Sequence, residues 1–265
     1  MAVIGFASVR SCGVTTLAAG VAMTWPKGRP RLLVEADPAG GTLGALAGLL
    51  PEPGLVSLAA AARRQGDPAL AFDHAQALPG GVPGGVPVVC GPPSASRACS
   101  ALSMLQGLLG RLGALDAEVC LDCGRLDQQT SNVELFEGAD LAVLACRPRL
   151  SDLSALASFA DERTWDAARP VLVLIGGGPY PAGEITDALG LDVAGELPWD
   201  PDTAAVLGAA PVSSRRLTRT PLVRALRSLD AELARRLEDT RAGRDRPSPT
   251  TPAPEKREPV AEVRP

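Results

Sequence analysis

Residues 8–16, SVRSCGVTT, have types and spacing that suit the binding of a phosphate group. They follow an apolar run over 3–7 and open a helical pattern over 17–25. A turn between a strand and a helix gathers unpaired amides and the positive end of the helix dipole, which favours an anion. In a phosphate loop of the type G-x-x-x-x-G-K-[ST], glycines wrap the phosphates, a lysine neutralises them and a hydroxyl binds Mg²⁺. Gly13, Thr15 and Thr16 fit this pattern.

The loop lacks the lysine of that pattern. Val14 stands in its place, and Ser8 stands where the first glycine is expected. A hydrogen bond to a charged group contributes about 1.5–3 kcal/mol, so phosphate binding should weaken roughly ten- to a hundredfold. Hydrolysis should suffer more, because phosphoryl transfer depends on positioning and charge stabilisation. Arg10 is the only cation of the turn, and it either swings over the phosphates or points into water. The residues expected to contact a phosphate are Arg10, Ser11, Cys12, Gly13, Val14, Thr15 and Thr16.

Two acidic residues follow apolar runs that are typical of buried parallel strands. Asp37 comes after the run over 31–34, and Asp122 ends the run that begins at Val119. Carboxylates at the C-terminal ends of such strands face the crevice where ligands bind, and one of them holds Mg²⁺-bound water in phosphate-loop enzymes. Asp37 is therefore either a site acid or the N-cap of the helix expected after Gly41.

The cysteines and the single histidine carry less weight as site residues. Six cysteines lie mostly in apolar segments without a regular framework, which indicates buried, reduced thiols. Cys120 and Cys123 have the spacing of a metal motif, but an odd separation on a strand sends two side chains to opposite faces. His74 lies in an Ala-rich segment and is expected to be a surface or partly packed residue.

Strand-like and helix-like runs alternate along the chain, which predicts an α/β fold with a mostly parallel sheet covered by helices on both faces. Further strands are expected over 86–90, 141–146 and 171–175, with a short one near 195–198. Helices are expected over 95–112, 153–162 and 202–207, and two or three short ones over 42–77. Because only 3% of the residues are aromatic, Ala, Leu and Val must build the core.

The last helical run combines an apolar stripe with many arginines. The stripe is formed by Leu222, Leu226, Leu229, Leu233 and Leu237. Between positions 213 and 246, ten arginines and five acids give a local charge of +5. Such a helix either docks its stripe on the domain or lies on an anionic membrane surface. The Pro-rich, charged remainder is expected to be disordered, which gives one domain over 1–238 and a tail over 239–265.

The overall composition limits the class of protein. A net charge of −4 argues against a surface covered with nucleic-acid-binding charge. No apolar run is long enough to span a membrane, and no signal-peptide pattern opens the chain, so we expect a cytoplasmic protein. The abundance of Ala, Gly, Pro and Arg suggests a GC-rich, actinobacterial genome.

Together these residues resemble the MinD/ParA group of deviant phosphate-loop ATPases, including its CpaE/TadZ-like branch, which is associated with pilus and secretion systems. The resemblance covers about residues 1–237 and rests on four landmarks in the same order. The group's K-G-G-x-G-K-[ST]-T matches residues 9–16, its strand ending in D-x-D-P matches 33–38, and its Walker B strand ends at Asp122. Its later segment with G-x-I-P-x-D and G-x-P-V matches AGELPWD at 194–200 and APV at 210–212.

The resemblance implies a P-loop NTPase fold with ATP and Mg²⁺ as cofactors. It places Mg²⁺ at Thr15 and Asp122, and it makes Asp37 the catalytic acid that orients water. These magnesium-side residues are all present in the chain.

The phosphate side and the base side depart from the group's pattern. The group's two loop lysines, one reaching across a dimer and one holding the phosphates, fall on Val9 and Val14. Glu35 replaces the first acid of D-x-D, and glycines replace the base-recognising Asn expected after residue 175. This combination indicates a degenerate nucleotide site.

Three functions follow from the resemblance and its departures. The first is a MinD/ParA-like spatial-organisation scaffold with weak or absent ATP hydrolysis, acting through protein partners of a division, pilus or secretion apparatus. The second is a slow ATPase that uses Arg10 and forms a homodimer with ATP. The third is a chromosome-partition factor whose basic C-terminal helix binds the nucleoid.

Overall fold

The computed structural model describes residues 2–26, 30–79, 85–126, 132–163, 169–207 and 217–244, with the side chains of 243 and 244 left out. Its centre is an eight-stranded sheet in the order β3-β4-β2-β5-β1-β6-β7-β8. The strands are β1 Ala2–Ser8, β2 Arg31–Glu35, β3 Gln76–Leu78, β4 Val86–Val89, β5 Glu118–Arg125, β6 Leu141–Cys146, β7 Val171–Ile175 and β8 Val193–Leu197. Every neighbouring pair is parallel except β3 with β4. The predicted fold class is therefore confirmed.

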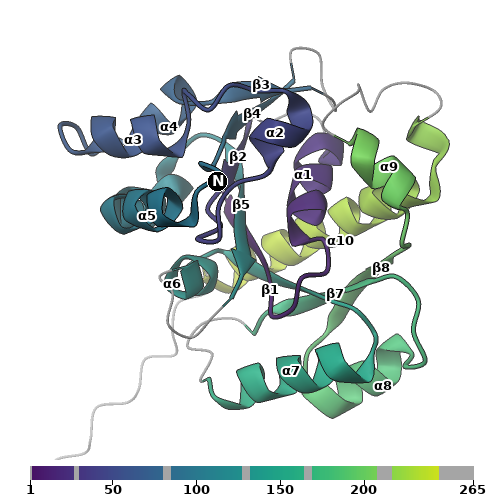
Figure 1. Cartoon of the computed structure of the whole chain (residues 1–265). Coiled ribbons are helices and arrows are strands. Elements are labelled where there is room, and N and C mark those ends of the chain that lie inside the picture. The colour runs from purple at the N-terminus through teal and green to yellow at the C-terminus, as the bar shows by residue number, and fades with distance from the viewer. Residues whose placement is uncertain are drawn as a thin grey trace, which may run out of the picture.

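Helices cover both faces of this sheet (Figure 1). One face carries α1 Val14–Thr24, α9 Pro201–Val206 and α10 Pro221–Arg244. The other face carries α3 Leu55–Ala62, α4 Leu70–Asp73, α5 Ala95–Leu109, α6 Asn132–Glu137, α7 Leu150–Asp161 and α8 Ala182–Leu189. The short α2 Leu43–Ala47 packs Leu43 into the core on the α1 side. Two hydrophobic cores result, one on each face of the sheet.

The central strands form because they are largely apolar, and the polar residues of β1 and β2 stand at strand ends. Every residue of β1, β2, β6 and β7 is buried. Strands of a parallel sheet lose both faces to helices, so continuous apolar runs are what such a sheet requires. The same geometry separates the two cysteines of β5: Cys120 packs in the core beside α1 and Cys123 in the core on the other face. The prediction that the two side chains point to opposite faces of the sheet is confirmed.

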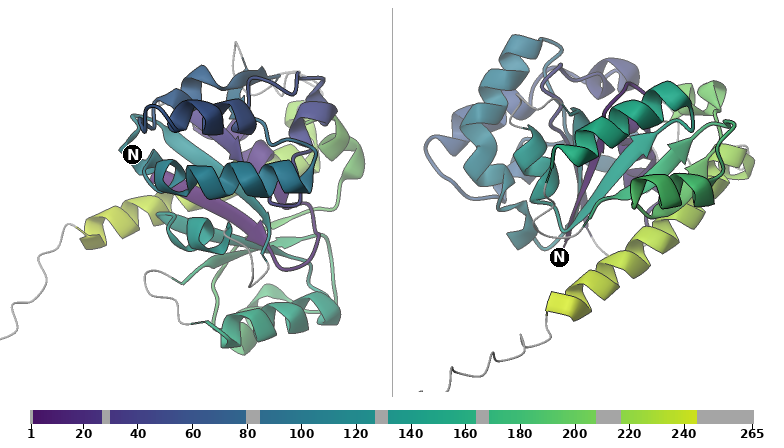
Figure 2. Two further views of the ribbon diagram at one scale, coloured as in Figure 1. Left: turned by 60° about the vertical axis from the view of Figure 1, so that its left-hand side comes forward. Right: turned by 90° about the horizontal axis from the view of Figure 1, so that it is seen from below.

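Helix α10 lies along the sheet and against α1, and its far end projects from the body of the domain (Figure 2). All five leucines of its predicted stripe are buried. Gly20 of α1 permits the close approach, since a Cβ at this position would lie 2.7 Å from Cδ1 of Leu226. The prediction that the stripe docks on the domain is confirmed. The helix continues to Arg244, past the expected start of the tail at 239, and residues 245–265 lie outside the described part.

Several elements differ from the expectation. The helical segment expected up to residue 77 ends at Asp73, and Gln76–Leu78 instead form β3, which pairs antiparallel with β4. Helix α5 ends at Leu109 rather than at 112. The short helices α6 and α8 were not expected. In β3, pairing with a neighbouring strand decides a conformation that three residues of local sequence do not specify.

His74 is partly buried, as expected, and its Nδ1 lies 2.8 Å from Oγ of Ser57. Within the described ranges, no helix is both long enough and apolar enough to span a membrane.

Candidate functional site

The predicted loop joins β1 to α1 as a strand, a turn and a helix. Strand β1 ends at Ser8 and α1 begins at Val14. Gly13, the residue before the helix, has a φ of 100°, a left-handed conformation that glycine adopts at little cost. Ser11 and Gly13 are exposed, whereas Cys12 is 1% exposed. The backbone frame of a phosphate loop is therefore present.

The two valines that replace lysines are part of the hydrophobic packing. Val14 is only 7% exposed and belongs to the core beneath α1. Val9 is partly buried and packs against the core on the opposite face of the sheet. Neither position supplies charge, and the side chain that would reach a phosphate is directed into apolar surroundings instead.

Two arginines lie near the loop, and one of them was missed in the sequence. Arg10 is exposed. Arg147 directly follows β6, and its guanidinium lies 4.7 Å from the ring centre of Trp199. Burial raises the pKa of the Cys12 thiol to about 11, against smaller lowering effects from Ser8 and from the charge of Arg147. The signal in the sequence was the position of Arg147 at the end of a buried strand, at the same edge of the sheet as the loop.

Asp122 is fully buried beside Thr15, as the pattern predicts. Its Oδ1 accepts a hydrogen bond of 3.0 Å from the amide of Gly124, while Oδ2 has no partner among the described residues. Burial raises the pKa of this carboxyl to about 7, and the Thr15 hydroxyl lowers it by a smaller amount. A buried carboxylate oxygen without a partner, next to a hydroxyl, is a donor set that suits Mg²⁺. In the described part of the chain, no three His, Cys, Asp or Glu side chains group closely enough to hold a metal by themselves.

Asp37 lies at the same edge and is half-buried. Its Oδ1 accepts a 2.7 Å hydrogen bond from the amide of Ala39, which closes a tight turn. The alternative role of helix N-cap is wrong, because Thr42 occupies the N-cap position of α2. Burial raises the pKa of Asp37, and the Ala39 amide and the charge of Arg125 lower it. Gly124 makes room for this carboxyl, since a Cβ there would lie 2.1 Å from its Cγ.

Glu35, in contrast, accepts hydrogen bonds from the backbone. It is 1% exposed, and its Oε1 accepts hydrogen bonds from the amides of Thr42 at 2.6 Å and Leu43 at 3.0 Å. Its Oε2 accepts one from Gly91 at 2.9 Å. Burial raises the pKa of Glu35, and these three amides lower it. The carboxylate therefore fixes the start of α2 and the turn after β4 rather than facing a ligand.

A pocket of about 310 Å³ opens beside the loop, between α1, the ends of β7 and β8, α9 and α10. Its walls include Leu17, Ile175, Leu197 and Leu226, which are 0–7% exposed. Two of the glycines that stand after β7, where the resemblance expects an Asn, have structural reasons. Gly176 has a φ of 76°, and a Cβ on Gly178 would lie 1.9 Å from the carbonyl oxygen of Pro148. Residues 210–212, matched to the group's G-x-P-V, lie outside the described residues.

These residues fit the two parts of a nucleotide complex unequally. Thr15 and Asp122 fit Mg²⁺, because the orphan oxygen of Asp122 is buried and unpaired. A triphosphate fits less well, because Val14, at the position of the lysine, is buried in the core and Arg10 is exposed to solvent. The loop therefore has the strand, turn and helix of a phosphate loop, and Val14 supplies no charge at the position of the lysine.

The sequence matches no family model, and no curated protein is similar to it. Its structure is similar to solved structures that include the following three. A ParA family ATPase from Chlorobium tepidum TLS has a TM-score of 0.68 and 18% identity, covering 87% of this chain and 98% of its own. The cell division ATPase MinD from Pyrococcus furiosus also has a TM-score of 0.68 and 18% identity, covering 88% and 98%. The septum site-determining protein MinD from Pyrococcus horikoshii OT3, complexed with Mg-ADP, has a TM-score of 0.61 and 17% identity, covering 90% and 98%. The chain therefore has the P-loop NTPase fold of the MinD and ParA ATPases.

Proposed function

We propose that this protein is a MinD/ParA-like spatial-organisation scaffold with weak or absent ATP hydrolysis. The burial of Val14 in the core carries this proposal, because a phosphate loop without its lysine loses charge stabilisation where the transition state needs it. The fold supports the positioning role, since the similar structures include a cell division ATPase and a septum site-determining protein. In this proposal the protein works in the cytoplasm, with partners from a division, pilus or secretion apparatus.

Calorimetry with ATP and Mg²⁺ on wild type and the Val14→Lys variant tests the scaffold proposal. We expect wild type to bind at best weakly and the variant to bind at least about tenfold tighter, because the backbone frame is intact. Val14→Met is the matched control, since it adds similar length without charge. Saturable binding by wild type, together with ATP turnover that Asp37→Ala abolishes, would contradict the proposal.

A slow ATPase is the second candidate, and one observation favours it. Asp122 keeps an unpaired buried oxygen beside Thr15, and Asp37 lies at the same edge. In this version Arg10 or Arg147 supplies the missing charge, and ATP drives formation of a homodimer. The readouts are the melting temperature and the oligomeric state with and without Mg-ATP, in wild type, Arg10→Ala and Arg147→Ala. If ATP changes neither quantity in wild type, this candidate fails.

A further inference from the structure

One buried carboxylate joins two turns at the C-terminal edge of the sheet. The turn after β2 comprises residues 36–42, and the turn after the neighbouring strand β4 comprises residues 90–94. Glu35 accepts hydrogen bonds through Oε1 from the amides of Thr42 and Leu43 and through Oε2 from the amide of Gly91. Because Glu35 is only 1% exposed, water competes little for these bonds. Glu35 therefore fixes both turns to the end of its own strand.

The two turns also contact each other through their backbones. The amide of Gly41 donates a 2.8 Å hydrogen bond to the carbonyl oxygen of Pro92. A Cβ on Gly41 would lie 2.3 Å from the carbonyl oxygen of Gly91, and a Cβ on Gly91 would lie 3.1 Å from Cα of Gly41. In addition, the thiol of Cys99 on α5 donates a 3.4 Å hydrogen bond to the carbonyl oxygen of Pro38. The turn after β2 is thus attached to its strand, to the turn after β4 and to α5.

The turn after β2 carries Asp37, the acid to which the resemblance assigns catalysis. In the chain, Asp37 lies between Glu35 and the two amides of α2 that Glu35 binds first, so both ends of its segment are held. Its carboxyl also lies against Gly124 of β5, where a Cβ would be 2.1 Å from Cγ of Asp37. Segments that respond to ligands have few buried contacts and solvent-exposed hydrogen bonds. The bonds of Glu35 are instead buried or partly buried.

We propose that Glu35 holds the turn after β2 in one conformation whether or not a ligand occupies the phosphate loop. A ligand would have to break three hydrogen bonds to a buried carboxylate before this turn could move, and bonds to a charged group are the strong ones. The group's Asp at this position is one methylene shorter, so the reach of Glu35 is a feature of this chain. The proposal rests on the scaffold role and deepens it, because a scaffold held in one state presents the same surface to its partners at all times.

Amide hydrogen exchange, measured by NMR on the full chain, tests the proposal. In ligand-free wild type, we expect the amides of Thr42, Leu43 and Gly91 to exchange at least about a hundredfold more slowly than in an unfolded chain. Glu35→Asp should lose at least about tenfold of this protection, because the shorter side chain cannot reach all three amides. The amides of β1 report any general loss of stability, and Glu184→Asp, at an exposed position of α8, is the matched control. Fast exchange in wild type, or full protection in Glu35→Asp, would overturn the proposal.

The Val14→Lys variant separates this proposal from the scaffold proposal. When Mg-ATP saturates the variant, the exchange rates of the three amides should stay within about twofold of their ligand-free values. A larger change would refute the role of Glu35 and leave the scaffold role standing. Conversely, if wild type hydrolyses ATP while the three amides stay protected, the scaffold proposal fails and the role of Glu35 stands. If the variant does not bind Mg-ATP, the rates in wild type and Glu35→Asp decide.

Discussion

Glu35 and Asp37 are two residues apart at the end of one strand, yet they have opposite roles. Glu35 is buried and satisfies three backbone amides, whereas Asp37 is half-buried and closes a local turn. The D-x-D resemblance points to both positions, but only Asp37 lies where a ligand could meet it. A buried acceptor with three donors is a structural element of the fold, because its loss leaves those donors unpaired.

Replacing Glu35 should therefore cost stability rather than activity. We expect Glu35→Ala to lower the free energy of unfolding by about 2–4 kcal/mol, since three buried or partly buried amides lose their acceptor. Asp37→Ala should cost less than about 1 kcal/mol, because its one bond is in an exposed turn. Urea denaturation measures both, and Glu35→Gln, which keeps one acceptor oxygen, should fall between them. Equal losses in Glu35→Ala and Asp37→Ala would contradict this division of roles.

The elements could be predicted where burial requires an apolar sequence, and could not where contacts with other elements determine the conformation. The strands β1, β2, β6 and β7 are apolar except at the ends of β1 and β2, because they are buried on both faces. The short β3, α6 and α8 have no such signature, because contacts with neighbouring elements determine their conformation. The site follows the same rule. Asp37 and Asp122 were found because apolar runs precede them, whereas Arg147 was overlooked although it directly follows β6. The glycines Gly91 and Gly124 depend on contacts with Glu35 and Asp37.

The loop after β7 shows how a contact between loops decides residue type. Gly178 lies against Pro148, and a Cβ would sit 1.9 Å from its carbonyl oxygen, whereas a Cβ on Gly177 would meet nothing within 4 Å. We expect Gly178→Ala to destabilise the protein by about 1–3 kcal/mol through backbone displacement. Gly177→Ala should be neutral or stabilising by up to about 1 kcal/mol, because it only restricts the unfolded chain. Thermal and urea unfolding of the two variants measure the difference, and equal stabilities would rule out the close contact.

Helix α10 carries a buried carboxyl that should make its docking depend on pH. Asp230 is 1% exposed, and neither carboxylate oxygen has a hydrogen-bond partner among the described residues. Burial raises its pKa to about 8, with smaller lowering effects from Thr24 of α1, Arg31 of β2 and Arg227 of α10. Because the folded pKa lies above the unfolded value of 3.8, ionisation favours the unfolded chain. Stability should therefore fall as the pH rises from about 4 to about 8.

Asp230→Asn tests this pH dependence. The variant should be more stable than wild type at pH 9 by roughly 2–5 kcal/mol and nearly equal to it at pH 4. Asp187→Asn, at an exposed position of α8, is the control and should follow the wild-type curve. If the stability of wild type and of Asp230→Asn changes with pH in the same way, the buried carboxyl of Asp230 is not the cause of the pH dependence. The comparison uses urea midpoints across the pH range.

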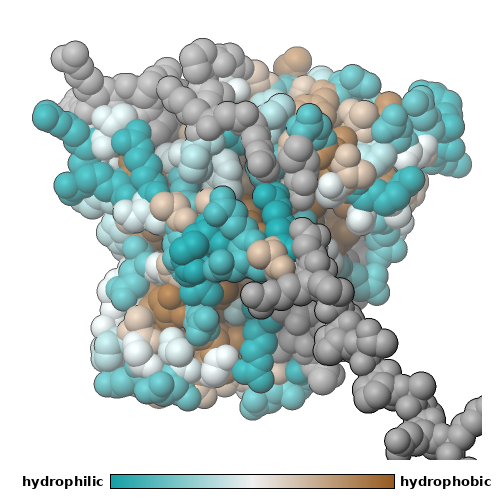
Figure 3. Space-filling view, turned by 180° about the vertical axis from the view of Figure 1, so that it is seen from behind, coloured by the Kyte–Doolittle hydropathy of each residue, from teal (hydrophilic) through white to brown (hydrophobic). Residues whose placement is uncertain are grey.

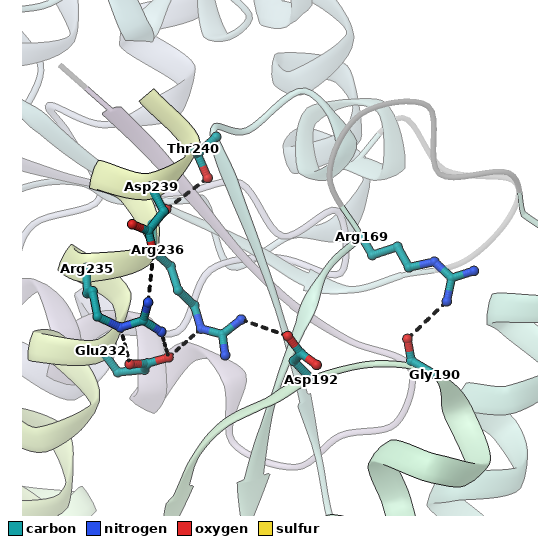
Figure 4. Close-up of polar contacts among 8 residues, drawn as sticks. All are labelled: Arg169, Gly190, Asp192, Glu232, Arg235, Arg236, Asp239 and Thr240. Atoms are coloured by element: carbon teal, nitrogen blue, oxygen red, sulfur yellow. Dashed lines mark hydrogen bonds and ion pairs between the residues drawn. The ribbon is translucent and has the colours of Figure 1, made fainter. Parts of the chain in front are cut away.

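At the scale of the whole molecule, the question is whether the basic end of the chain makes a nucleic-acid surface. Seen from behind, hydrophilic residues occupy much of the surface and hydrophobic residues show in recesses between them (Figure 3). Two arginines of α10, Arg235 and Arg236, form ion pairs with acids (Figure 4). Arg235 lies 2.7 Å from both Glu232 and Asp239, and Arg236 lies 2.6 Å from Glu232 and 3.3 Å from Asp192. Arg235 and Arg236 together lower the pKa of Glu232 to about 2, which keeps this acid charged.

Binding to DNA depends on cations that are free to replace counterions, so arginines held by carboxylates contribute little to it. Given also the net charge of −4, we expect binding to duplex DNA at physiological salt to be weaker than a Kd of about 10 μM. Fluorescence anisotropy with a labelled duplex over a series of salt concentrations measures this. The double variant Arg224→Ala and Arg227→Ala tests the two arginines near the start of α10. The double variant Arg63→Ala and Arg64→Ala, at the end of α3, is the control. Tight binding that falls steeply with salt and is lost only in the α10 pair would instead make the molecule a nucleoid-bound partition factor. If wild type and both double variants bind DNA equally weakly, α10 does not bind the nucleoid. Its role is then the one that its buried leucines indicate, which is to cover one face of the sheet.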